Sequence, residues 1–443
     1  MKNINDLRLK LATFIVCMFI WTIANAHEVT IDGLNYFLFP DTHEATLNHD
    51  NECQGELVIP SEVSYNGETY IVNGISVIAF KKSQELTKVR IPKTIDHVEH
   101  IRLSDAGLVA LTPDYDMNPF AGATALECIE VDEDSPIFKA VDGVLFSKDG
   151  TRLYCYPQGI KAEKYIVPEC VTWVGAAAFG GNKYLVMVEL PSTIEKLYTT
   201  FEGCSKLENV NLPDNMRSLD VNMFRGCSSL KTVYIPSGVT IIGSYAFWGC
   251  SSLESIVLPE NVIEIGSLAF CNCTSLDEFA IPSSVNIISD GMFMGCSSLK
   301  KVTIPEGVSI VGMEAFADCT SLMELDLPAS IDINDIGAYV FRECKLNNLI
   351  IRGDKGFYAN FNKYTFEGMD TSATIYCRAS LVEKVKELYG GVVLPLEQYL
   401  SGIRSMQYSS DKPSAAYDLQ GRRLSGQPTK GIYIQNGKKI VIK

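Results

Sequence analysis

The fold of this chain is decided by one stretch, which reads Phe247-Trp248-Gly249-Cys250-Ser251-Ser252-Leu253-Glu254-Ser255-Ile256-Val257-Leu258-Pro259-Glu260-Asn261-Val262-Ile263-Glu264-Ile265-Gly266. Ile256 and Leu258 alternate with Val257, as expected for a half-buried strand. Pro259 ends that strand because proline donates no ladder hydrogen bond. A second short apolar segment follows at Val262 and Ile265, and Gly266 permits a turn. The stretch therefore predicts one compact structural unit.

Three residue types recur with the period of this unit. Six cysteines stand 23 residues apart and a seventh follows after 25, while prolines and phenylalanines keep the same period. The cysteines are Cys204, Cys227, Cys250, Cys273, Cys296, Cys319 and Cys344. A single unit cannot bury its own apolar face, but a stack of units can. The repeats predict a β-rich, α/β-type solenoid, a right-handed superhelix of 22–23-residue rungs with a parallel sheet on one face.

The repeat pattern also predicts the organisation of the chain. We expect a solenoid over residues 27–400, because strand ends such as Leu57-Val58-Ile59-Pro60 lie outside the cysteine series. A hairpin is predicted as an insertion at about 136–157, and Ser104–Asn118 as a surface loop. The segment from Ala379 to Tyr389 predicts a capping helix. Residues 401–413 form a polar linker, and residues 414–443 form a small β module.

The first 26 residues have the composition of a secretory signal peptide. Lys2, Arg8 and Lys10 precede an apolar run from Leu11 to Ile23, and Ala24-Asn25-Ala26 supplies small residues for cleavage. The alternative is a transmembrane anchor, but the run is shorter than the roughly 20 residues that span a bilayer. Cys17 does not lie in a lipoprotein box. We therefore expect an exported protein that begins at His27 and has no later transmembrane segment.

Charge is distributed unevenly along the chain. The whole chain has a net charge of −15. The signal segment carries +2 and residues 414–443 carry +5, so the body between them, residues 27–413, carries −22. Such an acidic body repels phosphate backbones and disfavours nucleic-acid binding. It favours instead a protein partner with basic patches, bound less tightly at high salt.

The sequence offers no catalytic, cofactor or metal site. None of the five histidines lies in the regular repeats, where nucleophilic catalysis would need one. His97 and His100 lack a clear third metal ligand, and Asp132-Glu133-Asp134 lacks the spacing of a calcium loop. The cysteine series allows either disulfides or free thiols. Because the six evenly spaced cysteines share one phase, their parallel side chains meet poorly, which favours buried thiols acting as small apolar groups.

Two segments resemble known families. The unit from Ala246-Phe247 through Cys250, Leu253, Ile256 and Pro259 to Gly266 resembles the BspA-like leucine-rich repeats of bacterial surface proteins, over roughly residues 55–378. That resemblance implies surface display and adhesion to host proteins or other cells. The tail, with Tyr417-Asp418-Leu419-Gln420-Gly421-Arg422 and Gly431-Ile432-Tyr433-Ile434, resembles the C-terminal sorting domains of type IX secretion in Bacteroidota.

The leading functional hypothesis is a cell-surface protein-binding module, because outward strand positions of a solenoid vary freely while inward positions are fixed. The candidate partner-binding face consists of Asn211, Tyr234, Val257, Ala280, Thr303 and Asp326. The same positions could also form an ordinary solvated surface. The alternative function is glycan capture, which would require exposed aromatic platforms, and outside the signal segment the tryptophans are Trp173 and Trp248. A hydrolase has no candidate site.

Overall fold

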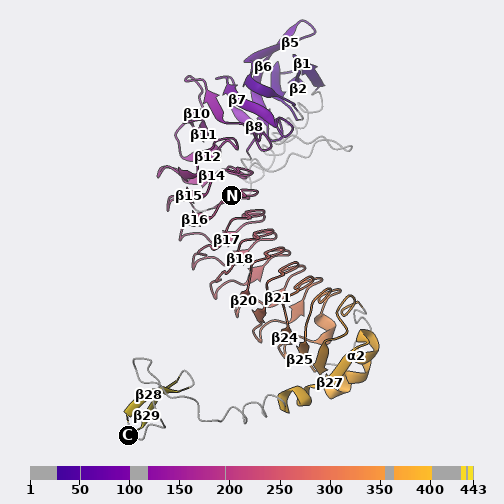
Figure 1. Cartoon of the computed structure of the whole chain (residues 1–443). Coiled ribbons are helices and arrows are strands. Elements are labelled where there is room, and N and C mark those ends of the chain that lie inside the picture. The colour runs from indigo at the N-terminus through magenta and orange to yellow at the C-terminus, as the bar shows by residue number, and fades with distance from the viewer. Residues whose placement is uncertain are drawn as a thin grey trace, which may run out of the picture.

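The computed structural model describes residues 27–49, 51–99, 118–194, 196–354, 364–401, 431–435 and 438–442. The predicted signal segment, the loop 104–118 except for Asn118, and most of the linker and tail lie outside the described residues. Figure 1 shows the described rungs stacked into a long curved array, with the N-terminal strands at one end and α2 (Val382–Tyr389) near the other.

The N-terminal end is a mixed sheet and differs from the parallel rungs that the sequence predicts from residue 27. Its strand order is β1-β2-β3-β6-β5, and β8 also pairs with β6. Antiparallel pairing joins β1 to β2, β2 to β3 and β5 to β6. The strands are β1 (His27–Ile31), β2 (Leu34–Phe39), β3 (Glu44–Leu47), β5 (Glu62–Tyr65), β6 (Glu68–Ser76) and β8 (His97–Glu99).

A first series of parallel strands lies at the repeat positions equivalent to Ile256-Val257-Leu258. Neighbouring strands pair in register, so that Glu278 lies beside Lys301 and Ala280 beside Thr303. The sheets are β4-β7-β9, β13-β15-β16, β20-β22 and β24-β25-β26-β27. The strands are β4 (Gln54–Val58), β7 (Glu85–Ile91), β9 (Cys128–Val131), β13 (Lys164–Ile166), β15 (Met187–Glu189), β16 (Asn209–Asn211), β20 (Glu278–Ala280), β22 (Lys301–Thr303), β24 (Glu324–Leu327), β25 (Asn348–Ile351), β26 (Thr374–Cys377) and β27 (Val392–Pro395).

The prediction of a parallel sheet on one face is incomplete, because the structure has a second series of parallel strands. This series lies at the repeat positions equivalent to Val262–Gly266, where Ile241 pairs with Glu264 and Ile287 with Ile310. Even two-residue strands suffice here because each rung supplies paired peptide groups to the next. The strands are β14 (Trp173–Val174), β17 (Ser218–Leu219), β18 (Ile241–Ile242), β19 (Glu264–Ile265), β21 (Ile287–Ile288) and β23 (Ile310–Val311), and the 3-10 helix η1 (Ile333–Asp335) follows them.

Three antiparallel strands interrupt the rungs at the predicted insertion. β10 (Phe138–Val141) pairs with β11 (Val144–Ser147), and β11 pairs with β12 (Arg152–Cys155). The first turn needs left-handed backbone at Asp142 and Gly143, which have φ values of 50° and 80°. β12 then pairs in parallel with β14, so that this insertion joins the second strand series.

Stacked phenylalanines form the centre of the core. The rings of Phe201, Phe224, Phe247 and Phe270 are fully buried, and consecutive ring centroids in this run lie 5.3–5.6 Å apart. Each ring lies in the apolar interior of its own rung and stacks on the rings of the neighbouring rungs. The core is therefore continuous along these rungs, as expected when identical units stack.

The C-terminal end closes the array. η2 (Ala379–Leu381) and α2 follow β26, and Val385 and Tyr389 of α2 are buried. Gly390 ends α2 in the left-handed conformation with φ 77°. Residues 396–401 are helical. A separate antiparallel hairpin joins β28 (Gly431–Gln435) to β29 (Lys438–Ile442).

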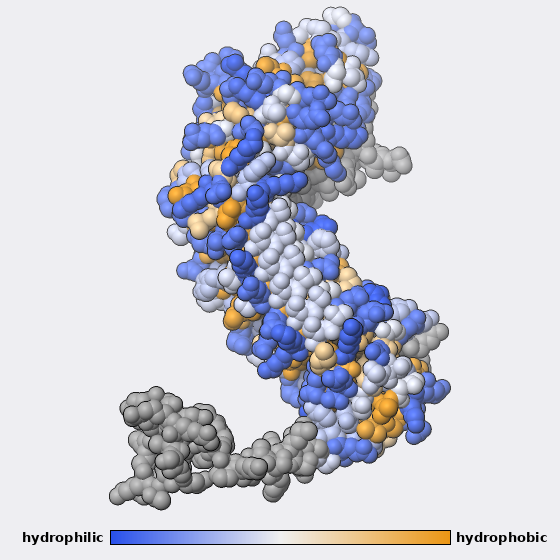
Figure 2. Space-filling view, viewed as in Figure 1, coloured by the Kyte–Doolittle hydropathy of each residue, from blue (hydrophilic) through white to orange (hydrophobic). Residues whose placement is uncertain are grey.

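The surface view shows where polar and apolar residues gather on one side of the array. Figure 2 shows mostly hydrophilic residues over the N-terminal strands and a pale band of intermediate hydropathy along the middle rungs. Within the described residues, no helix is long and apolar enough to cross a membrane.

Candidate partner-binding face

The six predicted face residues lie at the outward position of successive rungs. Asn211, Ala280, Thr303 and Asp326 belong to β16, β20, β22 and β24, whereas Tyr234 and Val257 lie at the equivalent position of two rungs in which no first-series strand is assigned. The inward neighbours of Tyr234, Val257, Ala280 and Asp326 are buried, as the alternating pattern predicts, whereas Val302 and Ile304 beside Thr303 are partly buried. The structure thus places all six side chains at equivalent positions of one series.

Exposure differs strongly among these six residues. Val257 is 84% exposed and Tyr234 is 66% exposed, and two such apolar side chains on neighbouring rungs are more informative than a single one. Ala280 and Thr303 are also exposed, whereas Asp326 is only partly exposed. The two most accessible apolar groups of the face therefore stand on consecutive rungs, Tyr234 before Val257.

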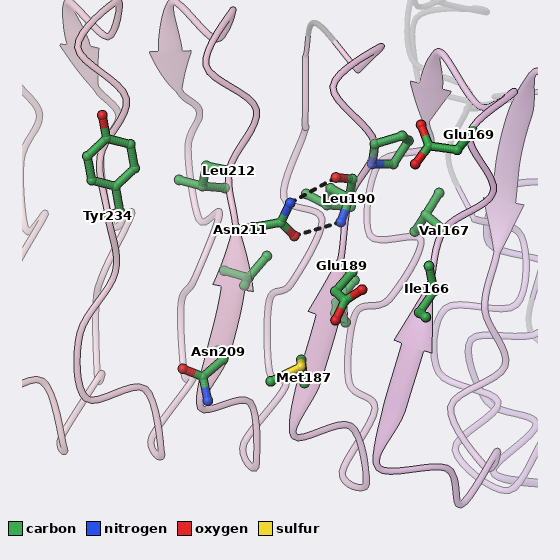
Figure 3. Close-up of a pocket in the computed structure, with 13 residues that line it drawn as sticks. Ile166, Val167, Glu169, Met187, Glu189, Leu190, Asn209, Asn211, Leu212 and Tyr234 are labelled. Atoms are coloured by element: carbon green, nitrogen blue, oxygen red, sulfur yellow. Dashed lines mark hydrogen bonds between the residues drawn. The ribbon is translucent and has the colours of Figure 1, made fainter.

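Two of the six side chains are occupied by contacts within the array. The Asn211 amide donates to the Leu190 carbonyl at 2.9 Å and accepts from the Leu190 N–H at 2.8 Å (Figure 3). Asp326 accepts two hydrogen bonds of 2.6 Å from the Arg352 guanidinium. Tyr399 lies beside this pair and donates to Glu324 at 3.1 Å. These contacts fix the margins of the face and leave Tyr234, Val257, Ala280 and Thr303 as its accessible members.

A groove of about 630 Å³ adjoins the face on its N-terminal side. Its walls come from β13, β15 and β16 together with Tyr234, as Figure 3 shows. Ile166 is 59% exposed there, and Met187 is partly exposed. Ile166 and Met187 are two further residues beside this face that were not predicted from the sequence. The signal was available, because Tyr165-Ile166-Val167-Pro168 has the same strand-and-proline pattern outside the cysteine series.

The middle of the face carries no charge at its outward positions. These positions are Asn209, Asn211, Thr232, Tyr234, Ser255 and Val257. Charges return on both sides of this stretch: Lys164 pairs with Glu189 at 2.6 Å, and Glu278 and Lys301 stand on later rungs. An uncharged stretch that carries exposed apolar side chains, with charges at its margins, matches the depletion of charge at the core of protein-binding surfaces.

The aromatic residues that glycan capture would need are arranged differently. The guanidinium carbon of Arg225 lies 5.0 Å from the centre of the Trp248 ring, and that of Arg152 lies 5.6 Å from the centre of the Trp173 ring. Both tryptophans also lie away from the face defined above, since Trp173 belongs to β14 and Trp248 to the turn before Cys250. Within the described residues, no three histidine, cysteine or acidic side chains are grouped closely enough to hold a metal ion.

The architecture and the repeat together define a leucine-rich-repeat protein, a class whose members in general bind other proteins and are not enzymes. The family model described as "BspA type Leucine rich repeat region" matches residues 152–255 and 240–373, which together span about half of the chain. The chain belongs to this family of BspA-type leucine-rich repeats.

Solved structures give related results. A leucine-rich-repeat protein of T. pallidum is 34% identical over 39% of this chain and 82% of its own, with a TM-score of 0.36. One from Bacteroides ovatus is 22% identical over 83% of this chain and 99% of its own, with a TM-score of 0.45. A leucine-rich cell-surface protein of Faecalibacterium prausnitzii is 19% identical over 83% and 97%, with a TM-score of 0.37. A comparison with curated proteins gives no match.

Proposed function

We propose that this protein is an exported cell-surface adhesin that binds a host or bacterial protein through the outward face of its first strand series. The observation that carries the proposal is the pair Tyr234 and Val257, two strongly exposed apolar side chains on consecutive rungs. Apolar groups at the centre of an uncharged surface contribute most to binding, because they are desolvated when a partner covers them. The stacked core beneath holds them in fixed positions, so little ordering entropy opposes association.

The composition of the face refines the expected salt dependence. The net charge of the body favours a basic partner, but the outward positions from Asn209 to Val257 are uncharged. Association at this face should therefore depend on apolar burial and change little with ionic strength. A strong salt dependence would indicate contacts elsewhere on the acidic body.

The test compares matched substitutions on the two strand series of the mature chain. Val257→Asp places a charge on the proposed face, and Ile287→Asp makes the same kind of change on the second series, where Ile287 is 40% exposed. Pull-downs with extracellular-matrix proteins and co-resident bacterial surfaces would identify partners, and titration would then give affinities. Tyr234→Ala and Val257→Asp should each weaken binding about tenfold or more, as expected for central contact residues.

Two results would contradict this assignment. If Tyr234→Ala and Val257→Asp bind as the unmodified protein does, the face is wrong even if the protein is an adhesin. If the mature chain retains a defined oligosaccharide on a glycan array but captures no protein, glycan binding replaces protein binding. The arginines over Trp173 and Trp248 count against that second function, because a sugar ring would have to displace them.

Export and surface display complete the proposal. The signal segment predicts a mature N-terminus at His27, and the tail that resembles a type IX sorting domain would direct the protein outward. N-terminal sequencing of surface material should give His27. Material that retains Met1 would contradict export through this signal.

A further inference from the structure

A second pocket lies at the N-terminal end of the array, far along the chain from Tyr234 and Val257. It has a volume of about 740 Å³ and is lined by residues of β1, β2, β4 and β5 and their connections. That size lies within the range of ordinary ligand sites. Ile31, Leu57 and Val58 contribute apolar walls, and Val58 is 67% exposed.

The pocket is lined by four carboxylates and by no basic side chain. The carboxylates are Asp32, Glu52, Glu56 and Glu62, all of them exposed, and none forms an ion pair with a described residue. The nearby Lys88 is held at 2.7 Å by Glu130, on the neighbouring strand β9. No three acidic groups in the described residues are close enough for a metal ion, so these carboxylates surround the pocket without converging on one point.

A tyrosine hydroxyl supplies a second and independent feature. The Tyr36 side chain lines the pocket and is only 1% exposed, and no described group forms a hydrogen bond with its hydroxyl. The hydroxyl oxygen is not among the fully buried atoms that lack a partner, so it reaches the space of the pocket from an otherwise buried ring. Burial, with a further contribution from Asp32, raises the pKa of Tyr36, so that the hydroxyl stays protonated and can donate to a ligand.

The backbone adds a third feature. Among the described strands β4 pairs only with β7, so it is the edge strand of the sheet β4-β7-β9. Six of the pocket residues belong to or directly precede this strand, from Glu52 to Val58. An edge strand presents unpaired peptide groups that an extended segment of another chain can pair with. Backbone pairing and carboxylates thus occur at one place.

We infer that this pocket binds an extended, lysine- or arginine-bearing segment of a partner protein. The segment would add to the free edge of β4, and its cations would lie against Asp32, Glu52, Glu56 and Glu62. Tyr36 would donate its hydroxyl to a carbonyl of the segment. The site accounts for the basic partner that the acidic body favours, and it is independent of the uncharged face around Tyr234.

The experiment uses the mature chain and a short fluorescent peptide of alternating lysine and threonine, followed by anisotropy. Glu56→Gln combined with Glu62→Gln should weaken binding about tenfold, because two exposed charge contacts are lost. Tyr36→Phe should weaken it about threefold through loss of one donor. The control Glu367→Gln with Glu383→Gln removes the same charge at the other end of the array and should leave binding unchanged.

Each feature of the site can be tested separately. Raising salt from about 50 mM to about 500 mM should weaken binding of the lysine peptide. A peptide with glutamate in place of lysine should not bind. A lysine peptide whose backbone nitrogens are methylated should bind more weakly, because it lacks backbone donors. Equal binding of the two lysine versions would overturn the strand addition. Equal affinity of the pocket variant and the control variant would overturn the site.

The outcome is also separable from the function proposed above. Val257→Asp should leave peptide binding unchanged, since Val257 lies outside the pocket. A loss of peptide binding in that variant would place the peptide on the outward face and overturn the separate N-terminal site. Melting temperatures of all variants, measured in parallel, show whether the exposed carboxamide substitutions keep the fold.

Discussion

The repeated cysteine has a specific hydrogen-bonding role in each rung. Cys250 donates its thiol to the Phe224 carbonyl at 3.1 Å, and the other members of the series make the same contact with the phenylalanine of an earlier rung. In the rung of Phe179, Asn182 stands at the cysteine position, and its amide donates to the carbonyls of Pro157, Gln158 and Ile160. The cysteine position of the repeat is therefore occupied by a small buried side chain that can donate a hydrogen bond to a backbone carbonyl.

This role gives a prediction for substitutions at Cys250. Cys250→Ala should cost about 1–2 kcal/mol, since it removes a buried sulfur and its hydrogen bond, while the Cys227 N–H still donates to the Phe224 carbonyl at 3.0 Å. Cys250→Ser keeps a donor and should cost no more than Cys250→Ala. Chemical unfolding of both variants measures the difference. A serine variant clearly less stable than the alanine variant would show that the site is purely apolar.

Burial of the same thiols predicts loss of stability at alkaline pH. Burial raises the pKa of Cys204 to about 12 and that of Cys344 to about 12, above the ordinary value of 9.0. A pKa raised in the folded state gives stability that is complete below pH 9 and is lost as the pH rises toward 12. Each such thiol should lower the free energy of unfolding by about 1.4 kcal/mol per pH unit in that window.

The measurement is urea unfolding at several alkaline pH values under reducing conditions. Cys204→Ser should reduce the slope, because a hydroxyl does not ionise in this range. A stability that stays constant between pH 9 and pH 11 would contradict burial of the series as thiols.

At the scale of the element, the turn before each cysteine of the series connects its rung to the next through backbone hydrogen bonds. The residue before each of the seven cysteines of the series adopts the left-handed conformation, with φ values of 72° at Gly249 and 57° at Glu343. Its N–H donates to a later rung, as Gly249 does to the Cys271 carbonyl at 2.8 Å. Glycine adopts this conformation freely, whereas a residue with a Cβ is strained.

Opposite effects are therefore expected from two substitutions at equivalent positions. Gly249→Ala should destabilise the protein by about 1 kcal/mol, because alanine is strained at a positive φ. Crowding does not contribute, since the added Cβ would lie 3.8 Å from the nearest atom. Glu343→Gly should stabilise it by up to about 1 kcal/mol, since the Glu343 side chain is exposed. Thermal unfolding checks both. The same sign for the two changes would contradict this account of the turn.

The whole molecule derives its shape from the stacking of rungs rather than from packing around one centre. Buried residues form two core clusters, one within residues 34–155 and the other within residues 144–393, and contacts connect mainly neighbouring rungs. Solution scattering of the mature chain should therefore give a radius of gyration well above about 22 Å, the value for a compact domain of this length. A value near 22 Å would contradict an extended array.

Much of the fold was predictable from the sequence because the repeat fixes the environment of each inward side chain. Phe247, Cys250, Leu253 and Ile256 recur in phase, and all four are buried as predicted. The family of leucine-rich repeats follows from the same positions and is confirmed by the family model. The predicted face began with the cysteine series, and therefore Ile166 and Met187, whose rungs precede that series, were missed although their segments have the strand-and-proline pattern.

The sequence by itself determined the rung, since periodic apolar residues leave only stacking as a way to bury them. Only the tertiary structure decided that the rung pairs on two faces, that Asn211 and Asp326 are occupied by internal contacts, and that Tyr36 opens onto an acidic pocket beside β4. The physical reason is distance along the chain. A local pattern specifies which way a side chain points, whereas its partners come from rungs 20 or more residues away, and their positions are set only when the array is assembled.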